Sequence, residues 1–392
     1  MIETRFKKTD IGEVPEDWDI KMLGEIAPLQ RGFDLPTSTL QNGVVPVIYS
    51  NGICNFHNRG ICKAPGLVTG RSGTIGKFTF LSSGYYWPHN TTLWVTSFNN
   101  NSPLFVYYLY SFQKIEEFSS GSGVPTLNRN DVHKKRIPVP PFIEQQRIAT
   151  VLSDIDVLLS NLSKKIEKKK LIKLGVMQQL LTGKKRLAGF TEPWREKRLG
   201  ELCQLFGRIG FRGYTKADLV RKGEGAITFS PSDIHDNQLD YTNCTYISMF
   251  KYEESPEIKV YSGDIIFCKT ASIGKCAIVK ELNEKATINP QFVVMKNFVC
   301  SNVFLYYKLV EREFQERVKE ITGGSTIPTM SQEKLKEQVL LMPTLSEQTV
   351  IAAILSDMDK EIEILEAKRT KYEQVKQGMM QQLLTGKIRL ID

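Results

Sequence analysis

Apolar residues recur every three or four positions along two stretches of the chain, and this spacing predicts two long helices. The first helix is predicted from Glu144 to about Thr182. The second begins at Glu347 and repeats the first at an offset of 203 residues (347 − 144 and 378 − 175), without insertion or deletion. The predicted apolar stripe comprises Ile148, Val151, Ile155, Leu159, Leu162, Ile166, Ile172 and Val176, and then Ile351, Ile354, Met358, Ile362, Leu365, Tyr372, Val375 and Met379.

Residues that favour helix ends flank both stretches. Pro140-Pro141 and Pro343 precede them, and proline cannot continue an earlier helix. Ser346 is the predicted N-cap of the second helix, and Gly183 and Gly386 are the predicted C-terminal glycines. Each helix would hold about 38 residues and extend roughly 57 Å.

A helix of this length with a narrow apolar stripe needs a partner. Two arrangements fit the pattern: the helices pack on each other as a coiled coil, or each lies separately on a globular core. The equal length and shared register favour the coiled coil.

The segments before the helices alternate short strand-like runs with glycine and asparagine, which predicts mixed α/β (α+β) globular domains. Each contains a predicted short helix, 103–109 and 302–309. Residues 18–26 also resemble residues 194–202, at an offset of only 176. The second domain therefore carries about 27 extra residues, most of them before its Ile-Gly-Lys motif. The predicted organisation is domain 1–143, helix 144–183, domain 184–346, and helix with tail 347–392.

Composition narrows the class of protein. The chain has 392 residues, a formal charge of +9 and seven scattered cysteines without a CxxC pair. Scattered cysteines favour reduced thiols in a cytoplasmic protein, and the basic charge suggests an anionic partner such as nucleic acid. The start of the chain lacks the apolar core of a secretory signal, and no run of about 18 apolar residues would span a membrane.

The stretch Gly70–Lys77 superficially resembles a phosphate-binding P-loop. The pattern fails because Arg71 stands where the first glycine belongs, and Phe78 follows the lysine. We predict a glycine hairpin instead, repeated at 269–275, that offers cations and backbone N–H groups to DNA. A tight turn with exposed lysines is the alternative.

The loops 121–127 and 323–330 form a second repeated pair of small and hydroxylated residues. They suit close approach to a sugar–phosphate backbone, and the alternative is an ordinary surface loop. Asn289-Pro290-Gln291-Phe292 differs from a methyltransferase tetrad at its third position, and no glycine-rich cofactor loop precedes it.

Other polar groups suggest no chemistry. Cys54 and His57 lack a second ligand pair at metal spacing, so no metal site is predicted. Asp154, Asp156, Asp357 and Asp359 are predicted to be solvated rather than catalytic, and the lysines of 164–170 are predicted to form the wet face of the helix pair.

Taken together, these repeated motifs resemble the specificity subunit of Type I restriction–modification systems, over essentially the whole chain. The motifs are Glu-Gln-x-x-Ile-Ala and Leu-Ser-Asp-x-Asp in the helices, Gln-Gln-Leu-Leu-Thr-Gly-Lys at their ends, and the paired Trp, Ile-Gly-Lys and Pro-Thr motifs of the domains.

The resemblance implies a non-catalytic subunit with an internal pseudo-two-fold repeat. Each globular domain would read one half of a split DNA site, and the antiparallel helices would separate the two readers. Two methyltransferase subunits and motor–nuclease subunits would be the partners. S-adenosylmethionine, ATP and Mg²⁺ would belong to those partners, and no cofactor is expected here. The alternative is a coiled-coil adaptor that bridges proteins without touching DNA.

Candidate DNA-contacting residues come from the glycine hairpins and loops, and none is catalytic. In the first domain they are Arg31, Tyr49, Arg71, Lys77, Thr126 and Arg129. In the second they are Arg212, Lys269, Ser272, Lys275, Thr329 and Ser331.

Overall fold

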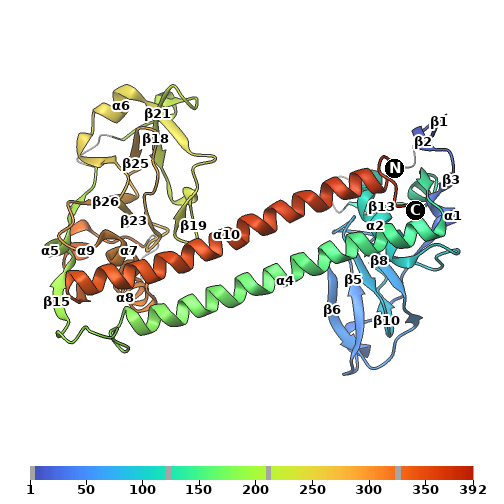
Figure 1. Cartoon of the computed structure of the whole chain (residues 1–392), viewed down its shortest axis with the longest axis horizontal. Helices are drawn as coiled ribbons and strands as arrows, with labels where there is room; N and C mark the ends of the chain where they lie inside the picture. The colour runs from blue at the N-terminus through green and yellow to red at the C-terminus, as the bar shows by residue number, and fades with distance from the viewer. Residues whose placement is uncertain (1–4, 121–124, 209–212, 323–327, 392) are drawn as a thin grey trace. The chain divides into compact units, whose positions relative to one another are not determined.

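The computed structural model describes residues 5–120, 125–208, 213–322 and 328–391 (Figure 1). The chain divides into two compact units, Met1–Lys164 with Glu366–Asp392, and Lys165–Leu365. Two helices contribute to both units, α4 (Phe142–Leu180) and α10 (Leu345–Leu383), each of 39 residues. The two predicted long helices are therefore confirmed, and each begins two residues earlier than predicted.

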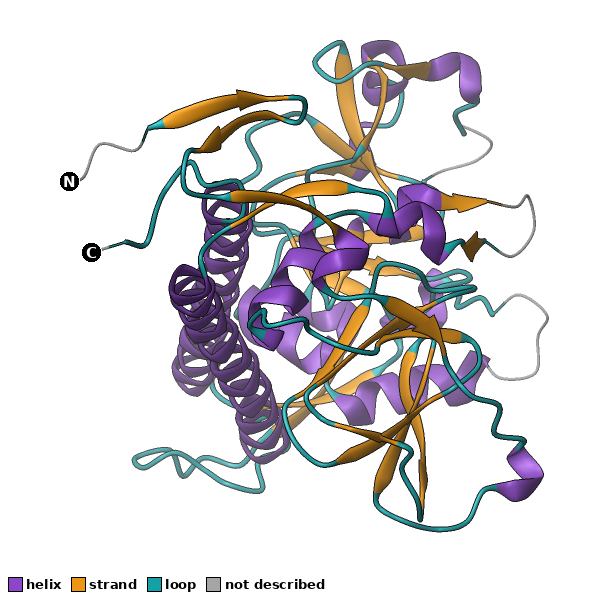
Figure 2. Cartoon of the chain, turned by 90° about the vertical axis from the view of Figure 1, so that its right-hand side faces the viewer, coloured by secondary structure: helices purple, strands orange, loops and turns teal. Residues whose placement is uncertain are grey.

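In each unit a segment of α4 lies side by side with a segment of α10 (Figure 2). In the second unit, Lys169 Nζ lies 2.7 Å from a carboxylate oxygen of Glu361, and Lys173 pairs with Asp359. In the first unit, Lys376 Nζ donates to Asp156 Oδ1 at 2.6 Å. Partner numbers fall along α10 as they rise along α4, so the paired segments run antiparallel, as predicted.

The predicted apolar stripe is correct in the middle of each helix and wrong further along. Leu162 and Ile166 are 7% and 4% exposed, whereas Ile172 and Val375 are 43% and 40% exposed. The step from Ile166 to Ile172 is six residues, which places Ile172 about 120° around the helix from Ile166 at roughly 100° per residue, and Val375 is the matched position of α10 (172 + 203). These two residues therefore lie on the surface.

The first unit contains two four-stranded sheets, one of which packs through β8 and β9 against the short helix α2 (Pro103–Phe112). Strands β5 and β10 pair in parallel, and the other ladders of the two sheets are antiparallel. One sheet has the order β6 (Gly52–His57), β5 (Val45–Tyr49), β10 (Tyr85–Pro88), β7 (Cys62–Lys63), and the other β4 (Leu29–Arg31), β11 (Thr92–Val95), β8 (Gly66–Gly70), β9 (Phe78–Leu81). Smaller pairs are β1 (Phe6–Thr9) with β2 (Gly12–Pro15), β3 (Asp19–Met22) with β14 (Arg136–Val139), and β12 (Ser119–Ser120) with β13 (Thr126–Leu127); α1 (Leu23–Ile26) and α3 (Arg129–His133) complete the unit.

The second unit repeats this architecture, including the parallel pair, here β18 with β25. One sheet has the order β16 (Gln204–Phe206), β26 (Phe292–Lys296), β23 (Ile265–Cys268), β24 (Cys276–Ile278), and the other β17 (Leu219–Val220), β21 (Thr245–Ser248), β18 (Gly225–Phe229), β25 (Ala286–Ile288), β22 (Lys259–Val260). The remaining elements are β15 (Arg195–Arg198) with β27 (Val339–Met342), α5 (Leu199–Leu202), α7 (Asn302–Val310), α8 (Arg312–Thr322) and α9 (Gln332–Lys336).

The extra residues of the second unit lie before the Ile-Gly-Lys motif, as predicted. They include the hairpin β19 (Ile234–His235) and β20 (Gln238–Leu239) and the short helix α6 (Met249–Glu253). The hairpin follows β18 and α6 follows β21, where the first unit has no comparable element among its described residues. The hairpin forms a separate two-stranded sheet, so the insertion leaves the common sheet order intact.

A buried carboxylate at the start of each long helix accounts for the glutamate of the repeated motif. Glu144 is 2% exposed. Its carboxylate accepts hydrogen bonds from Trp18 Nε1 at 3.0 Å and from Arg389 Nε and Nη2 at 2.8 Å each. The hydrogen bonds to the Glu144 carboxylate raise the pKa of the Arg389 guanidinium, so Arg389 stays charged. Because an unpaired buried carboxylate is costly, these residues must come together for the first unit to fold.

The second unit has the same arrangement. Glu347 is 1% exposed and accepts from Trp194 Nε1 at 3.1 Å and from Arg186 Nε at 2.8 Å. Arg186 and Arg389 are separated by the repeat offset of 203 (389 − 186). In both units the arginine follows the end of one long helix, and the glutamate lies in the first turn of the other.

The neighbouring glutamine of the motif joins each long helix to its globular domain. Gln145 Oε1 accepts from the backbone N–H of Ser102, the N-cap of α2, and Gln348 Oε1 accepts from Ser301, the N-cap of α7, both at 3.0 Å. The glutamine side chains also donate to the carbonyls of Pro140 and Pro343, at 3.0 and 2.9 Å.

Two of the four aspartates predicted to be solvated are instead structural, because each accepts a tyrosine hydroxyl. Asp156 accepts from Tyr108 at 2.7 Å and Asp359 from Tyr307 at 2.6 Å, and each also pairs with a lysine of the opposite long helix. Burial raises the pKa of both tyrosines, so they remain hydroxyl donors. Asp154 and Asp357 are exposed, as predicted.

The predicted helix ends need one correction. The cap of α10 is Thr344, whose Oγ1 accepts from Glu347 N at 3.4 Å, because the helix begins before the predicted cap Ser346. Gly183 and Gly386 do follow the helices in left-handed conformation, with φ of 71° and 72°.

Replacing Arg389 by methionine should destabilise the first unit by about 3 kcal/mol, because Glu144 would remain buried without its cation. The matched control is Arg312→Met in the exposed pair Arg312–Glu316, where no measurable change is expected. Urea unfolding of the full chain measures both variants. Equal, small effects would contradict the importance of the buried pair.

Candidate nucleic-acid interface

In the first unit, the glycine hairpin 70–77 lies against the loop that precedes α3. Ser72 and Thr126 form an isolated β-bridge. Leu127 N donates to Arg71 O at 2.8 Å, and Gly73 N donates to Pro125 O at 3.2 Å. Two motifs that were predicted separately therefore form one surface.

The second unit brings the corresponding segments together with the same contacts. Thr270 and Thr329 form the bridge, Met330 N donates to Lys269 O at 2.9 Å, and Ala271 N donates to Pro328 O at 3.0 Å. Residues 121–124 and 323–327 of these loops, and the candidate Arg212, lie outside the described residues.

The hairpins require their glycines. Gly76 and Gly274, the glycines of the two Ile-Gly-Lys motifs, have φ of 82° and 88°, which side-chain-bearing residues rarely adopt. A Cβ would also lie 2.4 Å from Glu116 Oε2 in the first hairpin and 2.2 Å from Gln315 Oε1 in the second. Strand β9 begins directly after Lys77, so no helix N-terminus is present to bind a phosphate as a P-loop would.

A third loop, between β10 and β11, reaches the same surface in the first unit. Arg71 N donates to Thr91 O at 2.8 Å, and Arg31 Nε donates to Asn90 O at 3.4 Å. The ring of Tyr49 lies 4.4 Å from the ring of His89. Burial lowers the pKa of His89, so arginine and lysine carry the positive charge here at neutral pH. Three of the predicted candidates, Arg31, Tyr49 and Arg71, thus meet at one loop.

The equivalent loop of the second unit, between β25 and β26, lies beside the second glycine hairpin. Lys269 N donates to Gln291 O at 2.8 Å, and Arg208 Nη2 donates to Ile288 O at 3.0 Å. Sequence reasoning missed His89, Asn90, Arg208 and Gln291. The signal for His89, Asn90 and Gln291 was their place in the loop between equivalent strands of the two copies, which becomes apparent only once the strand pairing is known. Arg208 follows β16, outside that loop.

The remaining candidates differ in exposure. Arg31, Lys77, Arg129 and Thr329 are exposed, whereas Tyr49, Arg71, Thr126, Lys269, Ser272 and Lys275 are half-buried. Arg129 Nη1 lies 3.5 Å from the carbonyl of Leu29.

Two candidates have structural roles in the second unit. Lys275 Nζ donates to the carbonyls of Pro231 and Ile234, at 2.7 and 3.2 Å, and so fixes the start of the inserted hairpin. Ser331 Oγ caps α9 by accepting from Lys334 N at 3.2 Å. Both polar groups bind the protein's own backbone.

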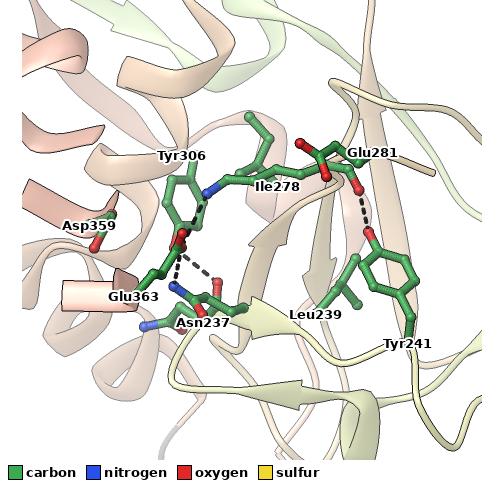
Figure 3. Close-up of a pocket in the computed structure, with 10 residues that line it drawn as sticks. Asn237, Leu239, Tyr241, Ile278, Glu281, Tyr306, Asp359 and Glu363 are labelled. Atoms are coloured by element: carbon green, nitrogen blue, oxygen red, sulfur yellow. Dashed lines mark hydrogen bonds and ion pairs between the residues drawn. The ribbon is translucent and has the colours of Figure 1, made fainter. Parts of the chain in front are cut away.

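The inserted hairpin also contacts α10 within the second unit (Figure 3). Gln238 Nε2 donates to Glu363 Oε1 at 3.1 Å, and Tyr306 OH donates to the carbonyl of Asn237 at 2.9 Å. A polar cavity of about 310 Å³ remains between Tyr241, Tyr306 and Glu363. Among the described residues no three His, Cys, Asp or Glu side chains are placed to bind a metal ion, so we interpret these contacts as a support for the hairpin.

These observations define a class of protein: a duplicated chain in which two α+β domains, each with a cationic loop surface, are built on a shared pair of long helices. The family model described as "Type I restriction modification DNA specificity domain" matches residues 15–171 and 191–374. The chain belongs to this family. It is therefore a specificity subunit, which contacts DNA, assembles with other subunits and has no enzymatic activity of its own.

Similar proteins cover nearly the full chain. The type I restriction enzyme MjaVIII specificity subunit of Methanocaldococcus jannaschii is 24% identical over 425 residues, covering 99% of this chain and 97% of that protein. The putative MjaX specificity subunit of the same organism is 25% identical, with the same coverage.

Solved structures support the fold. The crystal structure of the type I S subunit from M. genitalium has a TM-score of 0.63 at 14% identity, covering 98% of this chain and 99% of that one. A structure from work on complex assembly and conformational transition of the type I R-M system has a TM-score of 0.54 at 16% identity, covering 96% and 99%. None of the described helices combines the length and apolar character needed to cross a membrane.

Lys77 and Lys275 are matched residues of the two Ile-Gly-Lys motifs, and they should behave differently. A plot of log binding constant against log salt concentration has a negative slope. Lys77→Met should make that slope less steep by about one, because one phosphate contact is lost. Lys275→Met should leave the slope unchanged and lower the unfolding temperature, because its ammonium group holds two carbonyls. Duplex titrations at several salt concentrations measure the slopes, and equal slopes for Lys77→Met and wild type would contradict the phosphate contact.

Proposed function

We propose that each globular domain reads one half of a bipartite, asymmetric DNA site. It does so through the surface formed by its glycine hairpin, its Pro-Thr loop and the loop after the parallel strand. The observation that carries this proposal is that both domains place the glycine hairpin, the Pro-Thr loop and the loop after the parallel strand on one surface. Arginine, lysine and backbone N–H groups there can bind phosphate, while side chains of the third loop face base edges.

The domains share their sheet order, but the residues of these surfaces differ. At equivalent positions the third loop has His89 and Thr91 in the first unit, and Asn289 and Gln291 in the second. Unlike side chains at equivalent positions would select unlike bases, so the two half-sites would differ. The alternative of an adaptor that does not touch DNA loses its support, because the matched family is a DNA specificity domain.

The long helices, in this proposal, set the distance between the half-sites. Each helix has 39 residues and would extend about 58 Å at about 1.5 Å per residue. Antiparallel pairing with equal lengths would let two unlike domains approach their half-sites in a similar way.

The proposed partners are two methyltransferase subunits and, for cleavage, motor–nuclease subunits, in a cytoplasmic complex. S-adenosylmethionine, ATP and Mg²⁺ would bind to those partners. Two apolar positions of the long helices are exposed in both copies, which is the pattern expected for docking two copies of one subunit. They are Phe142 and Leu345, 46% and 58% exposed, and Ile172 and Val375, 43% and 40% exposed.

Lengthening both helices should lengthen the gap between half-sites. One heptad inserted after Lys164 and one after Leu365 preserve the apolar register and add about 10.5 Å, or roughly three base pairs. Sequencing that detects methylated bases, in cells with the variant and its methyltransferase, should show both half-sites unchanged and a longer gap. An unchanged gap would refute the role of the helices in spacing.

Charging the repeated apolar positions should prevent assembly. The double variant Phe142→Asp, Leu345→Asp should lose co-purification with the methyltransferase subunit, because charge at an apolar contact is unfavourable. Val44→Asp is the control, since Val44 is 88% exposed on the globular domain, and it should assemble normally. Normal assembly of the double variant would exclude this docking surface.

A further inference from the structure

The loop after strand β25 contains two amides that fix each other. Asn289 is only 7% exposed, and its Oδ1 accepts from the backbone N–H of Gln291 at 3.0 Å. Asn289 Nδ2 donates to Gln291 Oε1, also at 3.0 Å. The two residues therefore form a closed pair of hydrogen bonds.

This pairing determines the orientation of both amides. A backbone N–H can only donate, so the Asn289 atom that it contacts must be the oxygen. The other Asn289 atom is then the NH₂ group, which needs an acceptor, so the contacted atom of Gln291 must be its oxygen. The Gln291 Nε2 group has no hydrogen-bond partner among the described residues, and the residue is half-buried at the surface.

Gln291 lies on the surface that we propose reads the second half-site, beside the second glycine hairpin. Its carbonyl accepts from Lys269 N, and Lys269 is next to the Thr270–Thr329 bridge that joins the two repeated loops. Arg208, on the neighbouring strand end, donates to Ile288 in the same loop. Cationic groups thus flank a side chain whose orientation is set in advance.

We propose that Gln291 is a specificity-determining residue that reads a keto base, guanine or thymine, in the major groove of the second half-site. This inference rests on the proposed function. The edge of guanine presents the acceptors N7 and O6 and that of thymine presents O4, which match the NH₂ group of Gln291. Cytosine presents only a donor. Adenine pairs its N7 acceptor with an N6 donor that would need the Gln291 oxygen, and that oxygen is turned toward Asn289, so guanine and thymine match best.

The hydrogen bond from Asn289 to Gln291 provides a sharp test of this proposal. Asn289→Asp replaces the NH₂ donor of residue 289 by a second acceptor oxygen, with almost no change in the shape of the side chain. Gln291 would then turn its NH₂ group toward Asp Oδ2 and its oxygen toward the DNA, and the preference should change to an amino base, adenine or cytosine. The control is Asn297→Asp, the same substitution at an exposed amide that bonds Gln204 away from this loop. A second variant, Gln291→Met, removes both hydrogen-bonding groups.

Each variant is expressed with its methyltransferase subunits, and methylated sites are mapped across the genome. The map for Asn289→Asp should show one position of one half-site changed from a keto to an amino base on the same strand, for example G·C to A·T. The other half-site and the gap should stay as in the wild type, and Asn297→Asp should match the wild type throughout. Gln291→Met should make that position degenerate.

An unchanged half-site for Gln291→Met would overturn the proposal, as would a change in Asn289→Asp that keeps a keto base, such as G·C to T·A. If Asn289→Asp is too unstable to methylate DNA, the Gln291→Met map decides alone. A wild-type map without a bipartite site would refute the proposed function instead, so the two failures are distinguishable.

Discussion

The structure depends on the burial of one carboxylate in the first turn of each long helix. Glu144 and Glu347 are almost fully buried, so each must be paired. The partners are a tryptophan from the start of the globular domain and an arginine that follows the other long helix, Arg389 for Glu144 and Arg186 for Glu347. One interaction therefore ties a domain, the beginning of one helix and the end of the other, and each unit is complete only when both helices are present.

This constraint explains which parts of the chain repeat. The glutamate, glutamine and second aspartate of the helical motif each have a defined partner, and those partners recur in both copies. The loops at the strand ends carry no such requirement beyond the glycines of the hairpins. Residues such as His89 and Gln291 are therefore able to differ between the domains without loss of the common frame.

Sequence alone predicted the long helices, their pairing, the short helices and the position of the insertion, because helical periodicity and the repeat offset are local signals. The antiparallel orientation came from the resemblance to the specificity-subunit family. It did not predict the roles of Asp156 and Asp359, since hydrogen bonds to Tyr108 and Tyr307 join residues about 50 positions apart. It also did not predict the intramolecular hydrogen bonds of the candidates Lys275 and Ser331, whose polar groups bind backbone carbonyls and cap α9. Side-chain direction depends on tertiary contacts that spacing does not encode.

The repeated helices and the buried pairs Glu144–Arg389 and Glu347–Arg186 form the frame, and we propose that the divergent domains determine specificity. Replacing Gly200–Met330 by Gly24–Leu127 tests it most directly, because the transferred segment carries the same serine and tyrosine partners for the second frame. Mapping of methylated sites in cells that carry this chain and its methyltransferase should show two half-sites of identical sequence, separated by the wild-type gap. A methylated site that retains the wild-type second half would show that specificity lies outside the exchanged segment.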